Sequence, residues 1–150
     1  MKFKKLLCLA LALVCAFCFA VPVFAESGSE ILIDQYQDQL ADGTSVIVSV
    51  YQTRTVGRAS GSVSGHKDVT ESTGAWKLTV HGSFTYTGIS ATCTASSVTY
   101  EIYNSSWSCS SASSSRSGNT ATATGTFVRS TGNRVNASVS LSCNANGTIY

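Results

Sequence analysis

The stretch from Trp76 to Tyr86 alternates between apolar and polar residues. Its even positions are apolar and the odd positions between them are polar, which is the two-residue period of a β-strand with one buried face. Gly82 takes an inward position without a side chain, which predicts a bulge or a close backbone approach. The inward apolar residues are Trp76, Leu78, Val80, Phe84 and Tyr86. The rest of the chain has to supply strands that cover this face.

The first 25 residues have the three parts of a secretory signal peptide. Three lysines form the positive end, an apolar run from Leu6 to Ala20 follows, and Val23-Phe24-Ala25 predicts cleavage after Ala25. The apolar run is about 15 residues long, whereas a membrane-spanning helix needs roughly 20. We therefore expect a secreted, extracellular protein with no stable membrane insertion after the signal is removed.

Removal of the signal changes the charge of the chain. The whole sequence has a formal charge of +2, but three of its ten Lys and Arg lie in the signal and all eight Asp and Glu lie beyond it. The mature chain is therefore nearly neutral, with no basic excess to attract nucleic acid or anionic lipid. About a third of it is Ser or Thr, which suit turns and strands. This composition favours one all-β domain with hydroxyl-rich outward faces.

Residues 26–43 differ from the rest because they hold five of the eight acidic residues. Ile33, Tyr36 and Leu40 are spaced to line one side of a short helix. Such a short polar helix is rarely stable alone in water. We predict a loosely held polar leader over residues 26–43, helical at most, that ends at the Asp42-Gly43 turn; a disordered leader is the alternative.

Residues 44–150 are predicted to form the β domain. Two regions break the two-residue period, and we expect loops at residues 66–74 and in the Ser-rich segment 110–118. About eight strands, with no convincing helix, predict an antiparallel two-sheet sandwich with Greek-key or jelly-roll connections. The alternating segments lie near residues 46–51, 59–63, 76–86, 89–93, 98–102, 107–109, 121–127 and 135–143.

Three cysteines remain after the signal: Cys93, Cys109 and Cys143, all at inward positions. A Cys93–Cys143 disulfide would span Trp107 in a Cys-Trp-Cys order similar to that of immunoglobulin domains. Leu141 stands where those domains carry a Tyr, so we expect a sandwich outside that family. A bridge through Cys109 and three reduced core thiols are the alternatives, because connectivity cannot be deduced from sequence.

Candidate catalytic residues are few. The nearest approach to a nucleophile elbow has Val63 where the serine should stand. We expect His66 to be an exposed loop residue and His81 to be a solvated residue on the outward face of its strand. Asp68 and Glu71, the nearest pair of carboxylates for glycoside hydrolysis, share a predicted solvated loop. The cysteines lack C-x-x-C spacing and a nearby His. We expect no enzymatic activity, no cofactor and no metal.

A neutral, hydroxyl-rich sheet with a few outward aromatic rings is typical of surfaces that bind uncharged polar ligands such as glycans. Tyr51 and Tyr103 have the opposite parity to the main apolar residues of their strands, and they are the candidate ligand-stacking residues. The alternative for both is burial in a second layer or against the leader.

Four segments of the chain resemble those of a protein family: Met1–Ala25, Trp76–Gly88, Tyr103–Trp107 and Ser117–Ala121. They are similar to small, uncharacterised secreted proteins of Gram-positive gut bacteria of the clostridial type. Such families have no assigned activity, so the resemblance implies location and origin rather than mechanism.

Two functional hypotheses follow. The first is an exported, non-catalytic β-sandwich that binds an extracellular ligand, either a glycan or a surface protein. The second is a secreted effector or antimicrobial protein that acts on competing bacteria, which fits the small size and the export signal. The near-zero charge and the lack of a cationic amphipathic helix argue against a membrane-lytic mode for such an effector.

Overall fold

The computed structural model describes residues 29–53 and 59–150, and within these ranges the chain is all-β with no helix. No segment of these ranges forms a helix that is long and apolar enough to cross a membrane. The predicted signal peptide and its cleavage after Ala25 lie outside the described residues. The strands are β1 (Glu30–Gln39), β2 (Ser45–Thr53), β3 (Gly61–Glu71), β4 (Trp76–Tyr86), β5 (Ala91–Ile102), β6 (Trp107–Ser117), β7 (Thr120–Arg129) and β8 (Arg134–Ser142).

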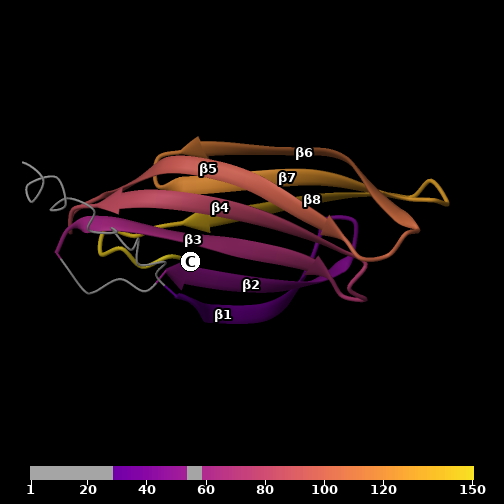
Figure 1. Cartoon of the computed structure of the whole chain (residues 1–150), viewed down its shortest axis with the longest axis horizontal. Helices are drawn as coiled ribbons and strands as arrows, with labels where there is room; N and C mark the ends of the chain where they lie inside the picture. Colours follow the sequence, from indigo (N-terminus) through magenta and orange to yellow (C-terminus); the bar gives the residue numbers. More distant parts are fainter. Residues whose placement is uncertain (1–28, 54–58) are drawn as a thin grey trace, which may run out of the picture.

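These eight strands form two antiparallel sheets, which confirms the predicted two-sheet architecture (Figure 1). The larger sheet has the order β1-β2-β3-β4-β5 and the smaller one the order β6-β7-β8. Because neighbours in sequence are neighbours in each sheet, both are meanders, and the predicted Greek-key or jelly-roll connections are not the ones observed. Short turns are enough to join antiparallel neighbours within each sheet. The chain passes from the larger sheet to the smaller one between β5 and β6.

The core lies between the two sheets and is organised by β4, whose bounds are those predicted. Its even-numbered side chains are all buried. The ring of Trp76 stacks on Phe127 of β7, with ring centroids 4.0 Å apart and an interplanar angle of 7°. Trp107 of β6 meets the same indole edge-on at 6.4 Å. One aromatic side chain of the large sheet therefore contacts two strands of the small one.

Gly82 lies beside a bulge, as one of the two predictions for it expected, but the groups that approach it are side chains rather than backbone. A Cβ atom there would lie 2.7 Å from the ring of Phe84 and 3.2 Å from Leu141 of the opposite sheet. The β4–β5 register shifts beside it, where Ser83 and Phe84 face Ala95 and Cys93. The missing side chain thus leaves room for Phe84 to turn into the core.

Two segments predicted as loops are largely strands. Residues 66–71 belong to β3, whose outward side chains are polar and whose inward positions include Gly65 and Lys67, so the apolar alternation fades there. Residues 110–117 belong to β6, which is an edge strand with mostly exposed serines. Its backbone pairs with β7 along its length, and these hydrogen bonds do not depend on apolar side chains.

The polar leader is a strand, so the prediction of helical structure was wrong. β1 pairs with β2 along its length, and the register shifts between Leu32 and Asp34, which leaves Ile33 as an extra residue. This bulge explains the misleading spacing of Ile33 and Tyr36, because one inserted residue turns a period of two into an interval of three. All ten side chains of β1 are exposed.

β1 and β2 extend beyond β3 on the side away from the small sheet (Figure 1). The end of the chain covers part of this overhang. The side-chain amide of Gln52 donates to the carbonyl of Gly147 at 3.1 Å and accepts from the backbone N–H of Ile149 at 3.0 Å. Ile149 is fully buried, and its side chain packs on Gly65 of β3. The C-terminal segment therefore seals the inner face that the smaller sheet does not reach.

The three cysteines of the described residues are free thiols, so the predicted Cys93–Cys143 bond is not formed in this structure. Cys93 and Cys143 are buried and Cys109 is half-buried, as their inward parity predicted.

We expect Phe127→Ala to lower the free energy of unfolding by about 3–5 kcal/mol, because it removes the buried partner of Trp76 and leaves a cavity. Chemical denaturation followed by tryptophan fluorescence measures this loss. Ile89→Ala is the control, since Ile89 is 91% exposed and its replacement should change stability by less than about 0.5 kcal/mol. A loss of similar size in both variants would contradict the role assigned to the stack.

Candidate functional site

The outer face of the five-stranded sheet, which points away from the small sheet, gathers most of the polar side chains singled out in the sequence. Register places them in rows, since residues directly opposite on neighbouring strands carry side chains about 5 Å apart. One row runs through Tyr51, His66, His81 and Ser97; the next through Ser49, Asp68, Thr79 and Thr99; the third through Ile47, Thr70, Lys77 and Glu101. The antiparallel register therefore brings residues far apart in sequence onto one polar face, on which Ser49 and Thr79 are themselves buried.

The histidine row, consisting of Tyr51, His66 and His81, crosses β2, β3 and β4. The Tyr51 and His66 rings are stacked, with centroids 4.5 Å apart and an angle of 18°. The His66 and His81 rings are 5.5 Å apart and tilted by 44°. The prediction that His66 is an exposed loop residue was wrong, because it lies within β3 and its side chain is only 18% exposed.

Two carboxylates flank His66. Its Nδ1 lies 3.1 Å from Oε2 of Glu30 on β1, and its Nε2 lies 3.9 Å from Oδ1 of Asp68 on its own strand. Asp68 also accepts a hydrogen bond of 2.8 Å from the hydroxyl of Thr79. The leader that was expected to be loosely held thus supplies a charged partner to the centre of the face.

His81 lies on the outward side of β4, as predicted, but it is half-buried. Burial lowers the pKa of His81 below its usual value, and the nearby His66 lowers the pKa further. Its Nε2 lies 3.0 Å from the hydroxyl of Thr99 on β5. A neutral imidazole is therefore favoured at this position, and it can either donate to or accept from a hydroxyl.

Lys77, Glu101 and Tyr103 form a second cluster at one end of the face. Lys77 Nζ lies 2.8 Å from Oε1 of Glu101, and the Tyr103 hydroxyl donates to the same carboxylate. These contacts lower the pKa of Glu101, chiefly through Lys77, and raise the pKa of Lys77, chiefly through Glu101. Both groups therefore stay ionised together over the neutral range.

The two predicted stacking residues both reach this face, but in different states. Tyr103 is 57% exposed and is held at its hydroxyl by Glu101. Tyr51 is half-buried, and one side of its ring is covered by His66. Sequence parity found both residues, but it could not show that Tyr51 has a ring partner on the next strand.

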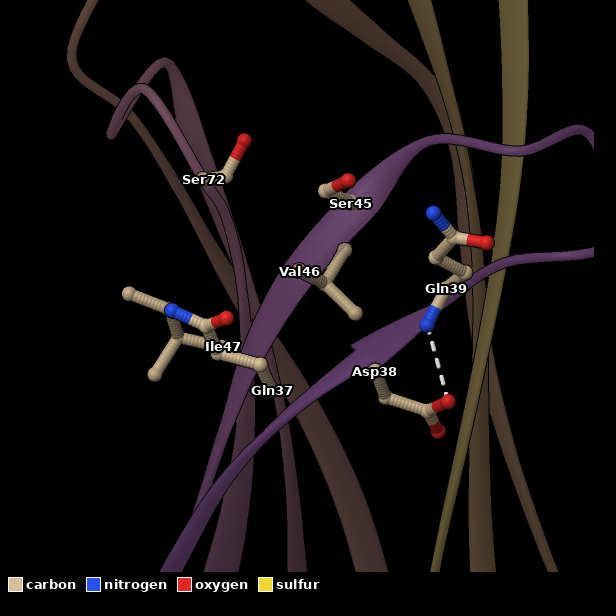
Figure 2. Close-up of a pocket in the computed structure, with 7 residues that line it drawn as sticks. All are labelled: Gln37, Asp38, Gln39, Ser45, Val46, Ile47 and Ser72. Atoms are coloured by element: carbon tan, nitrogen blue, oxygen red, sulfur yellow. Dashed lines mark hydrogen bonds between the residues drawn. The ribbon is translucent and has the colours of Figure 1, made fainter.

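Two depressions are open to solvent on this sheet. One of about 280 Å³ lies beside His81 and is bordered by Glu30, Ser64 and Ser83. Another of about 400 Å³ lies where β1 ends, β2 begins and the chain turns after β3 (Figure 2). Its lining is mostly amide and hydroxyl groups, with two aliphatic side chains: Gln37, Asp38, Gln39, Ser45, Val46, Ile47 and Ser72. Sequence reasoning missed this second depression, because Gln37 and Gln39 belong to the misassigned leader.

The hydroxyl and imidazole groups of this face can form hydrogen bonds, and the imidazoles can also exchange protons. His66 beside Glu30 has the geometry of an imidazole held by a carboxylate, but no hydroxyl or thiol of the described residues hydrogen-bonds to His66. Among the residues that the structure describes, no group of three His, Cys, Asp or Glu side chains could hold a metal ion.

Comparisons with known proteins add little to this geometry. No protein-family model and no curated protein sequence matches the chain. Its fold is similar to the 2.75 Å crystal structure of a hypothetical protein from Listeria monocytogenes EGD-e, with 11% sequence identity, a TM-score of 0.44, and coverage of 78% of this chain and 94% of that one. The resemblance to secreted proteins of clostridial-type gut bacteria stays a prediction.

We expect His81 to titrate below pH 6.5, its ordinary pKa, because burial and His66 both disfavour its protonated form. An NMR titration of the imidazole protons measures this directly, with His66→Gln and His81→Gln used to assign the two resonances. In His66→Gln the His81 pKa should rise but stay below 6.5, since burial remains. The unfolded chain then binds more protons than the folded one in this window, so His81 makes stability fall as pH drops below about 6.5. A His81 midpoint at or above 6.5 would contradict the assignment.

Proposed function

We propose that this protein is an exported, non-catalytic β-sandwich that binds an uncharged polar extracellular ligand, such as a glycan, on the outer face of its five-stranded sheet. The observation that supports this most directly is the registered rows of hydroxyl and imidazole groups across that face. Hydroxyl groups of a ligand and of the protein can both donate and accept hydrogen bonds, so such rows match a polyhydroxylated ligand well.

Charge pairing supports an uncharged ligand. Lys77 is neutralised by Glu101, and the carboxylates of Glu30 and Asp68 beside His66 disfavour an anionic ligand. Charges that already have partners produce little net field, so a charged ligand would gain little from long-range attraction. Selectivity on this face would come from hydrogen-bond geometry instead.

Tyr103 is the ring that we assign to ligand stacking. It is exposed, and the hydrogen bond from its hydroxyl to Glu101 restricts its orientation. A ring that is already ordered loses less conformational entropy when a ligand binds. Tyr51 instead contacts His66, because its ring is stacked on the imidazole and one face of the ring is therefore covered.

Export is the second part of the proposal, and the signal-like first 25 residues support it. Outside the cell the protein would meet both surface glycans and surface proteins. Export would also place Cys93 and Cys143 in an oxidising compartment, where disulfides form and persist.

We expect the purified protein to bind a subset of neutral glycans on a glycan array, and Tyr103→Ala to weaken that binding about tenfold, which corresponds to about 1.4 kcal/mol. Isothermal titration calorimetry with the best array ligand measures the change. Tyr150→Ala is the matched control, because Tyr150 is also 57% exposed but lies at the end of the chain. If both variants bound the glycan with equal affinity, the assignment of the binding site to the outer face would be contradicted. Absence of binding to neutral glycans, together with capture of a surface protein, would replace the glycan by a protein ligand.

A further inference from the structure

At one end of the sandwich, hydrogen bonds from both sheets meet at the β6–β7 turn. Cys93, near the start of β5, donates its backbone N–H to the carbonyl of Gly118 in the β6–β7 turn at 2.8 Å. Cys143, just after β8, donates its backbone N–H to the carbonyl of the next residue, Asn119, at 3.0 Å. The Asn119 side chain binds the Cys143 carbonyl at 2.7 Å as well. Two consecutive residues thus hold the backbones of both cysteines in place.

The two side chains point into the same core from opposite sheets. Cys93 belongs to the five-stranded sheet and is 6% exposed, and Cys143 continues β8 of the other sheet and is fully buried. Burial raises the pKa of both thiols, and a negative charge on Cys93 raises the pKa of Cys143 further. The hydrogen bonds of both backbones to consecutive residues of one turn place the two cysteines at the same end of the core.

Cys93 is the more accessible of the two. It lines an open depression of about 510 Å³ together with Thr92, Thr94 and Arg116. The positive charge of Arg116 partly offsets the rise in its pKa caused by burial. Because the thiolate is the reactive form of cysteine, access and a nearby cation make Cys93 the entry point for an oxidant.

We propose that Cys93 and Cys143 are the site of an inter-sheet disulfide and that Cys109 stays a single thiol. Cys109 lies near the start of β6, opposite Phe127, whereas the turn that holds the other two lies at the far end of that strand. Its thiol donates to the carbonyl of Ser111. The position of Cys109 therefore leaves it outside the proposed bond.

Formation of the bond requires a low-molecular-weight disulfide as oxidant and two exchanges. The Cys93 thiolate attacks one sulfur of the oxidant, whose S–S bond breaks and releases one thiol. The Cys143 thiolate then attacks Sγ of Cys93, displaces the second thiol and leaves the protein disulfide. Two protein thiols are oxidised while one disulfide is reduced to two thiols. Both cysteines must turn away from the carbonyls they now contact, those of Ala95 and Asn144, which costs little because thiols are weak donors.

The test uses the purified, fully reduced protein in a buffer of reduced and oxidised glutathione, quenched with N-ethylmaleimide and mapped by mass spectrometry without reduction. Trypsin alone leaves Cys93 and Cys109 on one peptide, so chymotrypsin is added to cut between them after Tyr100, Tyr103 and Trp107. The expected product is a Cys93–Cys143 peptide pair with alkylated Cys109. Because glutathione supplies the oxidant in the test tube, the result does not depend on whether the protein is exported. It does not depend on ligand binding either.

Cys109→Ser should form the same bond, and oxidation should lower its unfolding equilibrium constant by about three orders of magnitude relative to its reduced form, the effect of closing a loop of this length. Cys143→Ser should form no intramolecular bond. A bond that involves Cys109, or a Cys93–Cys143 bond that appears only in denaturant, would overturn the proposal. The map of the wild-type protein decides the question even where a variant fails to fold.

Discussion

The stack of Trp76 on Phe127 fixes how the two sheets meet. It places a large ring of the five-stranded sheet flat against a ring of the three-stranded sheet, with Trp107 closing the edge. The buried indole N–H of Trp76 has no hydrogen-bond partner among the described residues, which costs about 1–3 kcal/mol. The apolar surface that the two rings bury contributes enough free energy of folding to offset this cost.

The three-stranded sheet covers only part of the inner face of the five-stranded sheet. β3, β4 and β5 face the small sheet, but β2 also presents buried valines beyond its reach. The C-terminal segment covers part of this inner face. It is held there by the Gln52 side-chain amide, which donates to the carbonyl of Gly147 and accepts from the N–H of Ile149. An amide suits this role, since it donates and accepts at once. The C-terminal residues are therefore part of the core.

The sequence predicted the strands that carry apolar residues and missed those that do not. β4 was found with its bounds because every inward position except Gly82 is apolar. β3 and β6 were partly taken for loops because several of their inward positions are Gly, Lys, Ser or Arg rather than apolar residues. β1 was expected to be helical at most, because a bulge at Ile33 changed the spacing. What holds these strands is backbone pairing with a neighbour, which leaves no trace in side-chain periodicity.

The candidate site was harder to predict for a related reason. Parity placed His81 and Tyr103 outward, but only cross-strand register shows that His66 stands between Tyr51 and His81. Register also places Lys77 opposite Glu101, and the Glu30 side chain reaches across β2 to His66. A composition with few charges could have meant a merely inert surface. Their arrangement within one sheet, among rows of hydroxyls, instead leaves a broad face that presents hydroxyl, imidazole and aromatic groups.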